Sequence, residues 1–149
     1  MNHAKWILTI LSLLGSVATT SKVAHASGII LKMGPASLGN GGSNPLGIPP
    51  GATDLALTYV TDNSFEFNLG LPGLLIGQRY TQKWGGYIAL GGGVAIDANG
   101  AGPAVYSSFG MDTGGDTYKF SMEYQQALGI TSKALIAPYA IRIGVGIWF

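Results

Sequence analysis

The chain has 149 residues, of which 10% are charged and 47% hydrophobic, and it contains 24 glycines and no cysteine. This length is that of one domain, and the lack of cysteine excludes disulfides, thiolate catalysis and zinc sites built on cysteine. A formal net charge of +1 at pH 7, with no cluster of lysine and arginine, argues against nucleic acid as a partner.

Residues 1–26 have the pattern of a secretory signal peptide. A short polar start with one lysine precedes the apolar stretch WILTILSLLGSVA, and the A-x-A motif Ala24-His25-Ala26 follows. The apolar stretch is too short to span a bilayer. We therefore predict export and cleavage after Ala26, which leaves residues 27–149 as the mature domain; cleavage after Ala18 is the alternative.

Cleavage after Ala26 would remove both histidines of the chain, His3 and His25. A mature protein with neither histidine nor cysteine lacks the side chains most often used in proton transfer and in binding transition metals. We accordingly expect no cofactor, no metal site and no enzymatic activity.

Beyond residue 26 the main pattern is an alternation of apolar residues with small or polar ones. A period of two residues is typical of strands whose two faces meet different surroundings. No later apolar run is long enough for a membrane helix. Turn motifs such as TDNS and LPGL separate the alternating segments. The predicted strands are, in chain order, 28–35, 54–62, 64–70, 73–81, 84–97, 103–112, 116–127 and 136–149.

The direction of the side chains is clear in most of these segments but ambiguous in 73–81 and 103–112. A glycine-rich loop is predicted over 37–52, and a longer Gly/Asn/Pro connection over 97–103. The stretch DTGGD, at 112–116, is predicted to form a tight hairpin turn.

Alternating strands of this kind fit two architectures. A soluble secreted β-sandwich, such as an adhesin, buries its apolar face and shows a charged one to water. Here the non-apolar face is mostly Gly, Ala, Ser and Thr, which would make a poor surface in water. A membrane barrel instead places its apolar face in lipid. We therefore predict an all-β fold, a closed antiparallel up-and-down transmembrane β-barrel of eight strands, with six strands as the alternative.

Aromatic residues gather near one end of the predicted strands. If the strands are counted from a periplasmic N-terminus, the turns at 61–64, 81–84 and 112–116 lie on the same side as the C-terminus. Such a belt at the membrane–water interface is typical of barrels in lipid. The aromatic residues at or near these positions are Tyr59, Phe65, Tyr80, Trp84, Tyr118 and Phe149.

The final segment, APYAIRIGVGIWF, alternates without interruption and ends on an aromatic residue. It resembles the C-terminal strand by which Gram-negative outer-membrane barrels are recognised for insertion. The resemblance implies the cell outer membrane as the location, with its lipid, lipopolysaccharide and the barrel-assembly machinery as partners. The residues that would carry this membrane-insertion signal are Tyr139, Ile141, Ile143, Val145, Ile147 and Phe149.

Within that class, several stretches resemble the outer-membrane protein W family. These are LTYVTDNSFEF with its Thr-Asp-Asn turn, LPGLLIGQRY and GGYIALGGGVAID. The resemblance implies a narrow channel for small hydrophobic molecules as the function, and such a molecule as a ligand; a purely structural barrel is the other interpretation. The chain is shorter than members of that family, and its outer loops, especially the one at 70–73, are nearly deleted. Functions that the outer loops have in the family therefore do not transfer to this chain.

Five charged residues fall on the small and polar faces of the predicted strands. In a barrel they would point into the lumen, where unpaired charges are costly, so we expect them to pair. The network would either fill and close the lumen or act as a selectivity or gating element. The Gly/Ala face of 84–97 leaves a narrow passage or room for large neighbours such as Tyr106 and Trp148. The charged residues are Lys32, Glu66, Lys119, Glu123 and Arg142.

Three motifs suggest other activities. Asp112-Thr113-Gly114 is the triplet of aspartic proteases, but a single copy between two amphipathic strands is explained more simply as a turn. The stretch 97–102 resembles the start of a calcium loop but lacks the downstream acidic ligand. Some outer-membrane barrels of this size modify lipid A with Ser-His-acid sites. Ser107 and Ser108 have no evident base here, so a lipid A-modifying enzyme is an alternative and not our main hypothesis.

Overall fold

The computed structural model describes residues 27–37, 53–97, 100–131 and 135–149. The predicted signal peptide and nearly all of the predicted glycine-rich loop lie outside these ranges. Among the described residues, no helix is long and apolar enough to cross a membrane. The strands are β1 (Gly28–Ser37), β2 (Thr53–Val60), β3 (Phe65–Gly70), β4 (Gly73–Thr81), β5 (Gly86–Asp97), β6 (Gly100–Gly114), β7 (Tyr118–Ile130), β8 (Leu135–Ile136) and β9 (Tyr139–Trp148).

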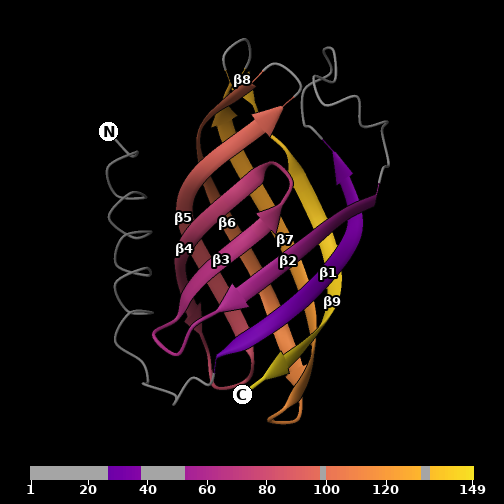
Figure 1. The fold of residues 1–149 in the computed structure, drawn as a ribbon. Helices are drawn as coiled ribbons and strands as arrows, with labels where there is room; N and C mark the ends of the chain where they lie inside the picture. Colours follow the sequence, from indigo (N-terminus) through magenta and orange to yellow (C-terminus); the bar gives the residue numbers. More distant parts are fainter. Residues whose placement is uncertain (1–26, 38–52, 98–99, 132–134) are drawn as a thin grey trace, which may run out of the picture.

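These strands close into a barrel (Figure 1). Each strand from β1 to β7 pairs antiparallel with the next, and β9 pairs with both β7 and β1. β8 is a two-residue strand that pairs only with the end of β7 in the described part of the chain. The prediction of an all-β, closed, antiparallel up-and-down barrel of eight strands is therefore confirmed, and the six-stranded alternative is wrong.

The last predicted strand, 136–149, is divided in the structure into β8 and β9. The break falls at Ala137-Pro138, because proline has no N–H to donate to a neighbouring strand. The carbonyl of Pro138 still accepts a hydrogen bond from the Ala127 N–H, at 2.9 Å.

The sixth strand is longer than predicted at both ends. Gly100 to Pro103 continue the pairing with β5, so the connection predicted over 97–103 is mostly strand. At the other end β6 runs two residues beyond the predicted end, to Gly114, so the tight turn predicted over 112–116 begins later, at Gly115, whose N–H donates to the Tyr118 carbonyl at 3.0 Å. The register of β6 against β7 carries the pairing this far.

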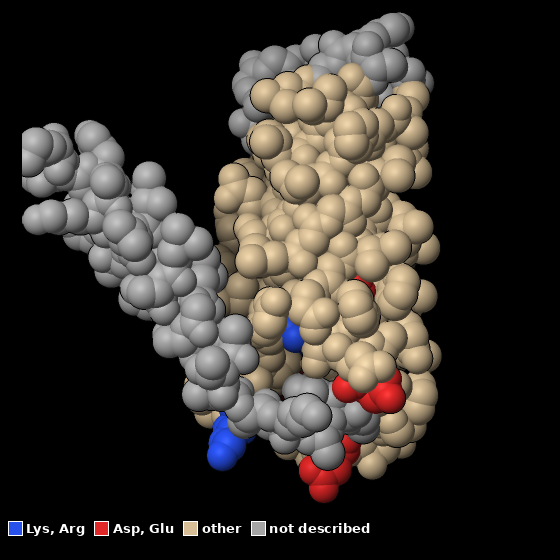
Figure 2. All heavy atoms as spheres, turned by 90° about the vertical axis from the view of Figure 1, so that its left-hand side faces the viewer, with Lys and Arg blue, Asp and Glu red and all other residues tan. Residues whose placement is uncertain are grey.

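Large apolar side chains cover the outside of the barrel, and charged ones lie inside. Ile143 is 63% exposed and Leu55 60%, whereas Lys32, Glu66 and Arg142 have no exposed surface. Most of the wall seen in Figure 2 is accordingly uncharged, and the charged side chains lie towards the lower end. A protein surrounded by water has the reverse distribution, because burial of unpaired charge is costly.

The end of the barrel where β1 begins and β9 ends is the lower one in Figure 1. The turns after β2, β4 and β6 lie at this end too, because successive strands run in opposite directions. The six aromatic residues expected there are all exposed, from 39% for Tyr59 to 70% for Trp84 and Tyr118. The wall therefore has a rim of exposed aromatic side chains at its lower end.

Candidate functional site in the barrel interior

Four of the five charged residues expected to face the lumen lie deep in the barrel interior. Lys32 on β1, Glu66 on β3, Glu123 on β7 and Arg142 on β9 are at most 1% exposed. Strand alternation points these four side chains inward, because the two sequence neighbours of each charged residue are apolar and lie on the outward face.

Glu123 is the acceptor for three donors from three strands. Lys32 Nζ lies 2.6 Å from Glu123 Oε2, and the Tyr87 hydroxyl donates to the same oxygen at 2.9 Å. Arg142 Nη1 lies 3.1 Å from Glu123 Oε1. Both carboxylate oxygens are thus satisfied, which a buried charge requires.

Arg142 connects Glu123 to the upper end of the lumen. Its Nε donates to Asp54 Oδ2 at 2.7 Å, and its Nη1 donates to Gln125 Oε1 at 2.9 Å. Its Nη2 donates to the Leu71 carbonyl at 3.2 Å, which also accepts from Gln125 Nε2 at 2.9 Å. The Leu71 N–H in turn donates to Asp54 Oδ1 at 3.2 Å. The tight turn between β3 and β4 is therefore tied into the lumen by side chains from three other strands.

A second ionic group is centred on Arg79 of β4. Its Nη1 lies 3.3 Å from Glu66 Oε2, and its Nη2 forms an ion pair with Asp112 Oδ2. The Tyr106 hydroxyl lies 3.4 Å from Glu66 Oε1. These four side chains come from β3, β4 and β6, so their contacts join strands that are one, two and three places apart in the sheet.

Tyr87 of β5 joins the two ionic groups. Its hydroxyl donates to Glu123, and the guanidinium carbon of Arg79 lies 3.4 Å from the centre of its ring. Contact of a guanidinium with an aromatic face is attractive, and more so where water is excluded. Polar contacts consequently run without interruption from Asp112 in the lower half to Asp54 near the upper end.

Lys119 lies apart from these ion pairs. Its ammonium stands 4.7 Å from the ring centre of Trp148, and its side chain is half-buried. Trp148 packs against Ile30 and Val60, two other interior residues near the lower end. The expected five-residue set thus separates in space into four deeply buried members and one at the lower mouth.

The upper half of the lumen is narrowed by close approach of the walls. A Cβ built on Gly129 of β7 would lie 2.7 Å from the Cβ of Ala95 on β5, although β6 stands between these strands in the sheet. A Cβ on Gly77 would lie 2.5 Å from the Tyr106 hydroxyl. Small residues therefore let the wall fold inward here, and a large one, Tyr106, occupies the space that they leave.

Sequence reasoning missed several members of the interior network. Arg79 and Asp112 lie in the two segments whose side-chain direction is ambiguous in the sequence. The alternation is obscured there because the apolar Leu75 and Tyr106 face the lumen, while the polar Gln78 and Ser107 lie on the outward face. Extending the alternation back from Tyr80, which is exposed, would have placed Arg79 inside. Asp54 was missed because it stood at a predicted strand end. Tyr87 is an aromatic residue on the otherwise small Gly/Ala face of its strand, so the alternation gives no sign of its role; the exposed Ile88 next to it indicates its inward direction.

The interior also carries polar atoms with no hydrogen-bond partner in the structure: Thr58 Oγ1, Asn68 Oδ1, Ser108 Oγ, Asp112 Oδ1 and Ser121 Oγ. Asn68 donates to Gln125 Oε1 at 2.8 Å through its nitrogen. Within the described ranges no three His, Asp or Glu residues come together in a way that could hold a metal ion. What the arrangement provides is a fixed set of paired charges across the lumen.

The residues of the expected insertion signal point outward from β9 or follow it. Their exposed fractions lie between 42% for Tyr139 and 68% for Phe149. Arg142, between Ile141 and Ile143, is the charged exception and turns inward.

No known family model matches the chain, and neither a curated protein nor a solved structure matches it.

Proposed function

We propose that the protein is an integral outer-membrane β-barrel whose lumen is closed, so that it serves as a structural membrane barrel and not as an open pore. The observation that carries the proposal is the inverted distribution of side chains. Large apolar residues are exposed on every long strand, while the paired charges lie inside. A contiguous apolar surface of this extent associates in water but matches hydrocarbon.

Strand length and closure support the same proposal. Strands need about 9–11 residues to cross a bilayer when tilted. β1, β4, β5, β6, β7 and β9 have 9 to 15 residues. Pairing of β9 with β1 closes the sheet, so its first and last long strands present no open edge, which hydrocarbon would penalise heavily. The signal-peptide pattern and the alternating last strand favour export and insertion by the barrel-assembly machinery.

A closed lumen is favoured over a passage for small hydrophobic molecules. Ion pairs of Glu123 and Arg79 cross the middle of the interior, and the walls approach each other above them. An apolar molecule would have to displace these pairs and leave charges unpaired in a dry space, which costs several kcal/mol. The charged interior therefore disfavours the cargo that the family resemblance implies.

Fractionation of Gram-negative cells that express the protein tests the membrane proposal. We expect the protein in the outer-membrane fraction, with a mobility on gels that shifts between unboiled and boiled samples. A protein found in the aqueous fraction with no mobility shift contradicts the proposal and favours a barrel that is secreted in soluble form.

Two further measurements address function within the membrane. In planar bilayers the purified barrel is expected to give no conductance steps, and stable steps would show an open pore instead. Lipid A isolated from overexpressing cells is expected to keep its mass, and a mass shift would support the lipid A-modifying enzyme.

A further inference from the structure

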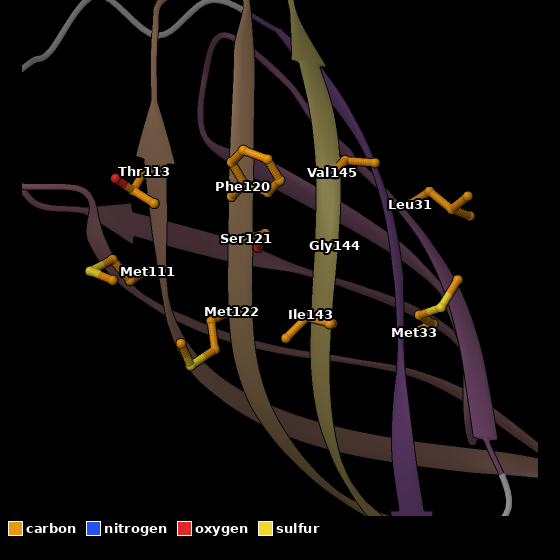
Figure 3. Close-up of a pocket in the computed structure, with 10 residues that line it drawn as sticks. All are labelled: Leu31, Met33, Met111, Thr113, Phe120, Ser121, Met122, Ile143, Gly144 and Val145. Atoms are coloured by element: carbon orange, nitrogen blue, oxygen red, sulfur yellow. The ribbon is translucent and has the colours of Figure 1, made fainter.

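A groove in the outer wall crosses four neighbouring strands (Figure 3). It encloses about 410 Å³, within the range of roughly 300–1,000 Å³ typical of pockets that bind small molecules. Ser121 and Gly144 lie between its two borders, where the first points inward and the second has no side chain. The backbone of β7 and β9 therefore forms the floor.

The register of the strands creates the two borders. Along each border, every residue is paired directly with its neighbour on the next strand. The upper border, nearer the upper end of the barrel in Figure 1 but drawn as the lower row in Figure 3, is Met111, Met122, Ile143 and Met33, on β6, β7, β9 and β1 in that order. The lower border, drawn as the upper row in Figure 3, is Thr113, Phe120, Val145 and Leu31, on the same strands. The groove thus spans three inter-strand spacings, or roughly 14 Å, and runs across the strands.

The lining is uncharged and adaptable. Three of the four methionines of the chain border the groove, at positions 33, 111 and 122. Methionine is unbranched and polarisable, so it adjusts to the outline of an apolar neighbour. The groove offers no charge to a headgroup or to a polar peptide. Its chemistry suits a flexible hydrocarbon.

We propose that this groove holds one acyl chain of a membrane lipid. The proposal rests on the membrane location proposed above. Within a bilayer the hydrophobic effect gives no preference for protein over lipid, so contact is decided by packing. An unfilled hollow loses dispersion contacts along its lining, and a single unbranched chain is narrow enough to restore them.

A second copy of the barrel is a poorer fit to the same groove. A stable protein interface covers about 800 Å² on each partner, with some 20–30 residues a side. The groove is lined by ten residues and lies between rows that are only two residues apart along each strand. Side chains from a facing barrel wall would meet its borders and not its floor.

The test uses the full-length mature barrel in nanodiscs of dimyristoylphosphatidylcholine, released in a native mass spectrometer. Val145→Trp and Leu31→Trp fill the groove from its lower border. Val105→Trp is the matched control, because Val105 is 58% exposed and Val145 57%, and Val105 lies on β6 outside the groove. Each variant is first shown to be inserted by its heat-dependent gel mobility.

We expect the wild type and Val105→Trp to retain one lipid after release, and both groove variants to lose it. Absence of a lipid adduct on the inserted wild type overturns the acyl-chain site, as does equal retention by all four proteins. A dimer that only the groove variants lose would show a protein interface and also overturn it. A barrel that never inserts contradicts the proposed membrane location instead, so the two failures are distinguishable.

Discussion

Glu123 and Arg142 lie directly opposite each other in the register of β7 and β9, and their charged ends also meet inside the barrel. Arg142 Nη1 is 3.1 Å from Glu123 Oε1. The pair therefore lies across one seam between neighbouring strands, and Asp54 and Lys32 extend it to β2 and β1. Charged residues from four strands are therefore joined in one network of ion pairs.

Replacement of Arg142 by methionine is expected to destabilise the barrel by about 3–5 kcal/mol, because it leaves Asp54 without its cation and Glu123 with Lys32 alone. Lys119→Met is the control, since Lys119 contacts the Trp148 ring outside the network. It should cost no more than about 1 kcal/mol. Urea unfolding in lipid vesicles measures both. Equal losses for the two variants would contradict the network described here.

Tyr87 offers a way to separate its two contacts. Tyr87→Phe removes the hydrogen bond to Glu123 and should cost about 1.5–3 kcal/mol, as expected for a bond to a charged group. Tyr87→Leu also removes the aromatic face beneath Arg79 and should cost about 0.5–2 kcal/mol more. The same unfolding measurement applies to both. If leucine and phenylalanine give equal stability, the ring–guanidinium contact contributes nothing.

The close approach of the walls can be tested with one methyl group. Gly129→Ala places a Cβ 2.7 Å from that of Ala95 and should destabilise the barrel by about 1–3 kcal/mol through overpacking. Gly115→Ala is the control, because a Cβ at Gly115 meets no atom within 4 Å. That variant should stay within about 0.5 kcal/mol of the wild type. If Gly129→Ala leaves the free energy of unfolding unchanged, β5 and β7 stand farther apart at the upper end than described.

A single arginine on the outer wall tests the lipid environment. Ile143→Arg puts a charge among the exposed apolar side chains of the outer wall and should reduce the free energy of unfolding in vesicles by about 2–4 kcal/mol. Asn63→Arg, in the exposed turn at the lower rim, should cost about 0–1 kcal/mol. If the two substitutions are equally mild in vesicles, the outer wall does not face hydrocarbon.

The strand order and the faces of most strands could be predicted from the sequence, because alternation survives wherever the outer wall is apolar. The sequence predicts the last strand as one piece, but the structure divides it at Pro138. The missing N–H of this proline interrupts the pairing with β7, so that β8 and β9 are separate strands. Proline interrupts a strand only where its missing N–H would have pointed to a neighbouring strand. Which side of the strand has a neighbour is known only from the assembled sheet.

The pairing inside the lumen was predictable only in outline. Alternation placed Glu66 and Arg142 inside, yet it could not show that Glu66 pairs with Arg79 while Arg142 pairs with Glu123. Partners across a lumen are set by the stagger of the strands around the barrel, which no single strand encodes. In the two segments that hold Arg79 and Asp112, the direction is obscured by the apolar Leu75 and Tyr106, which face inward against the pattern.

The junction of β1 with β9 has a consequence for assembly. Phe149 N–H donates to the Ser27 carbonyl at 2.9 Å, and Ile29 lies opposite Ile147, so this junction joins the two ends of the described chain. Contacts so distant in sequence carry the largest loop-closure entropy and form late. Before they form, the sheet has two open edges, β1 and β9. These edges can pair with each other, or with the open edges of a second chain that has not yet closed. Closure of one chain on itself therefore competes with pairing between chains, and a low protein concentration favours closure.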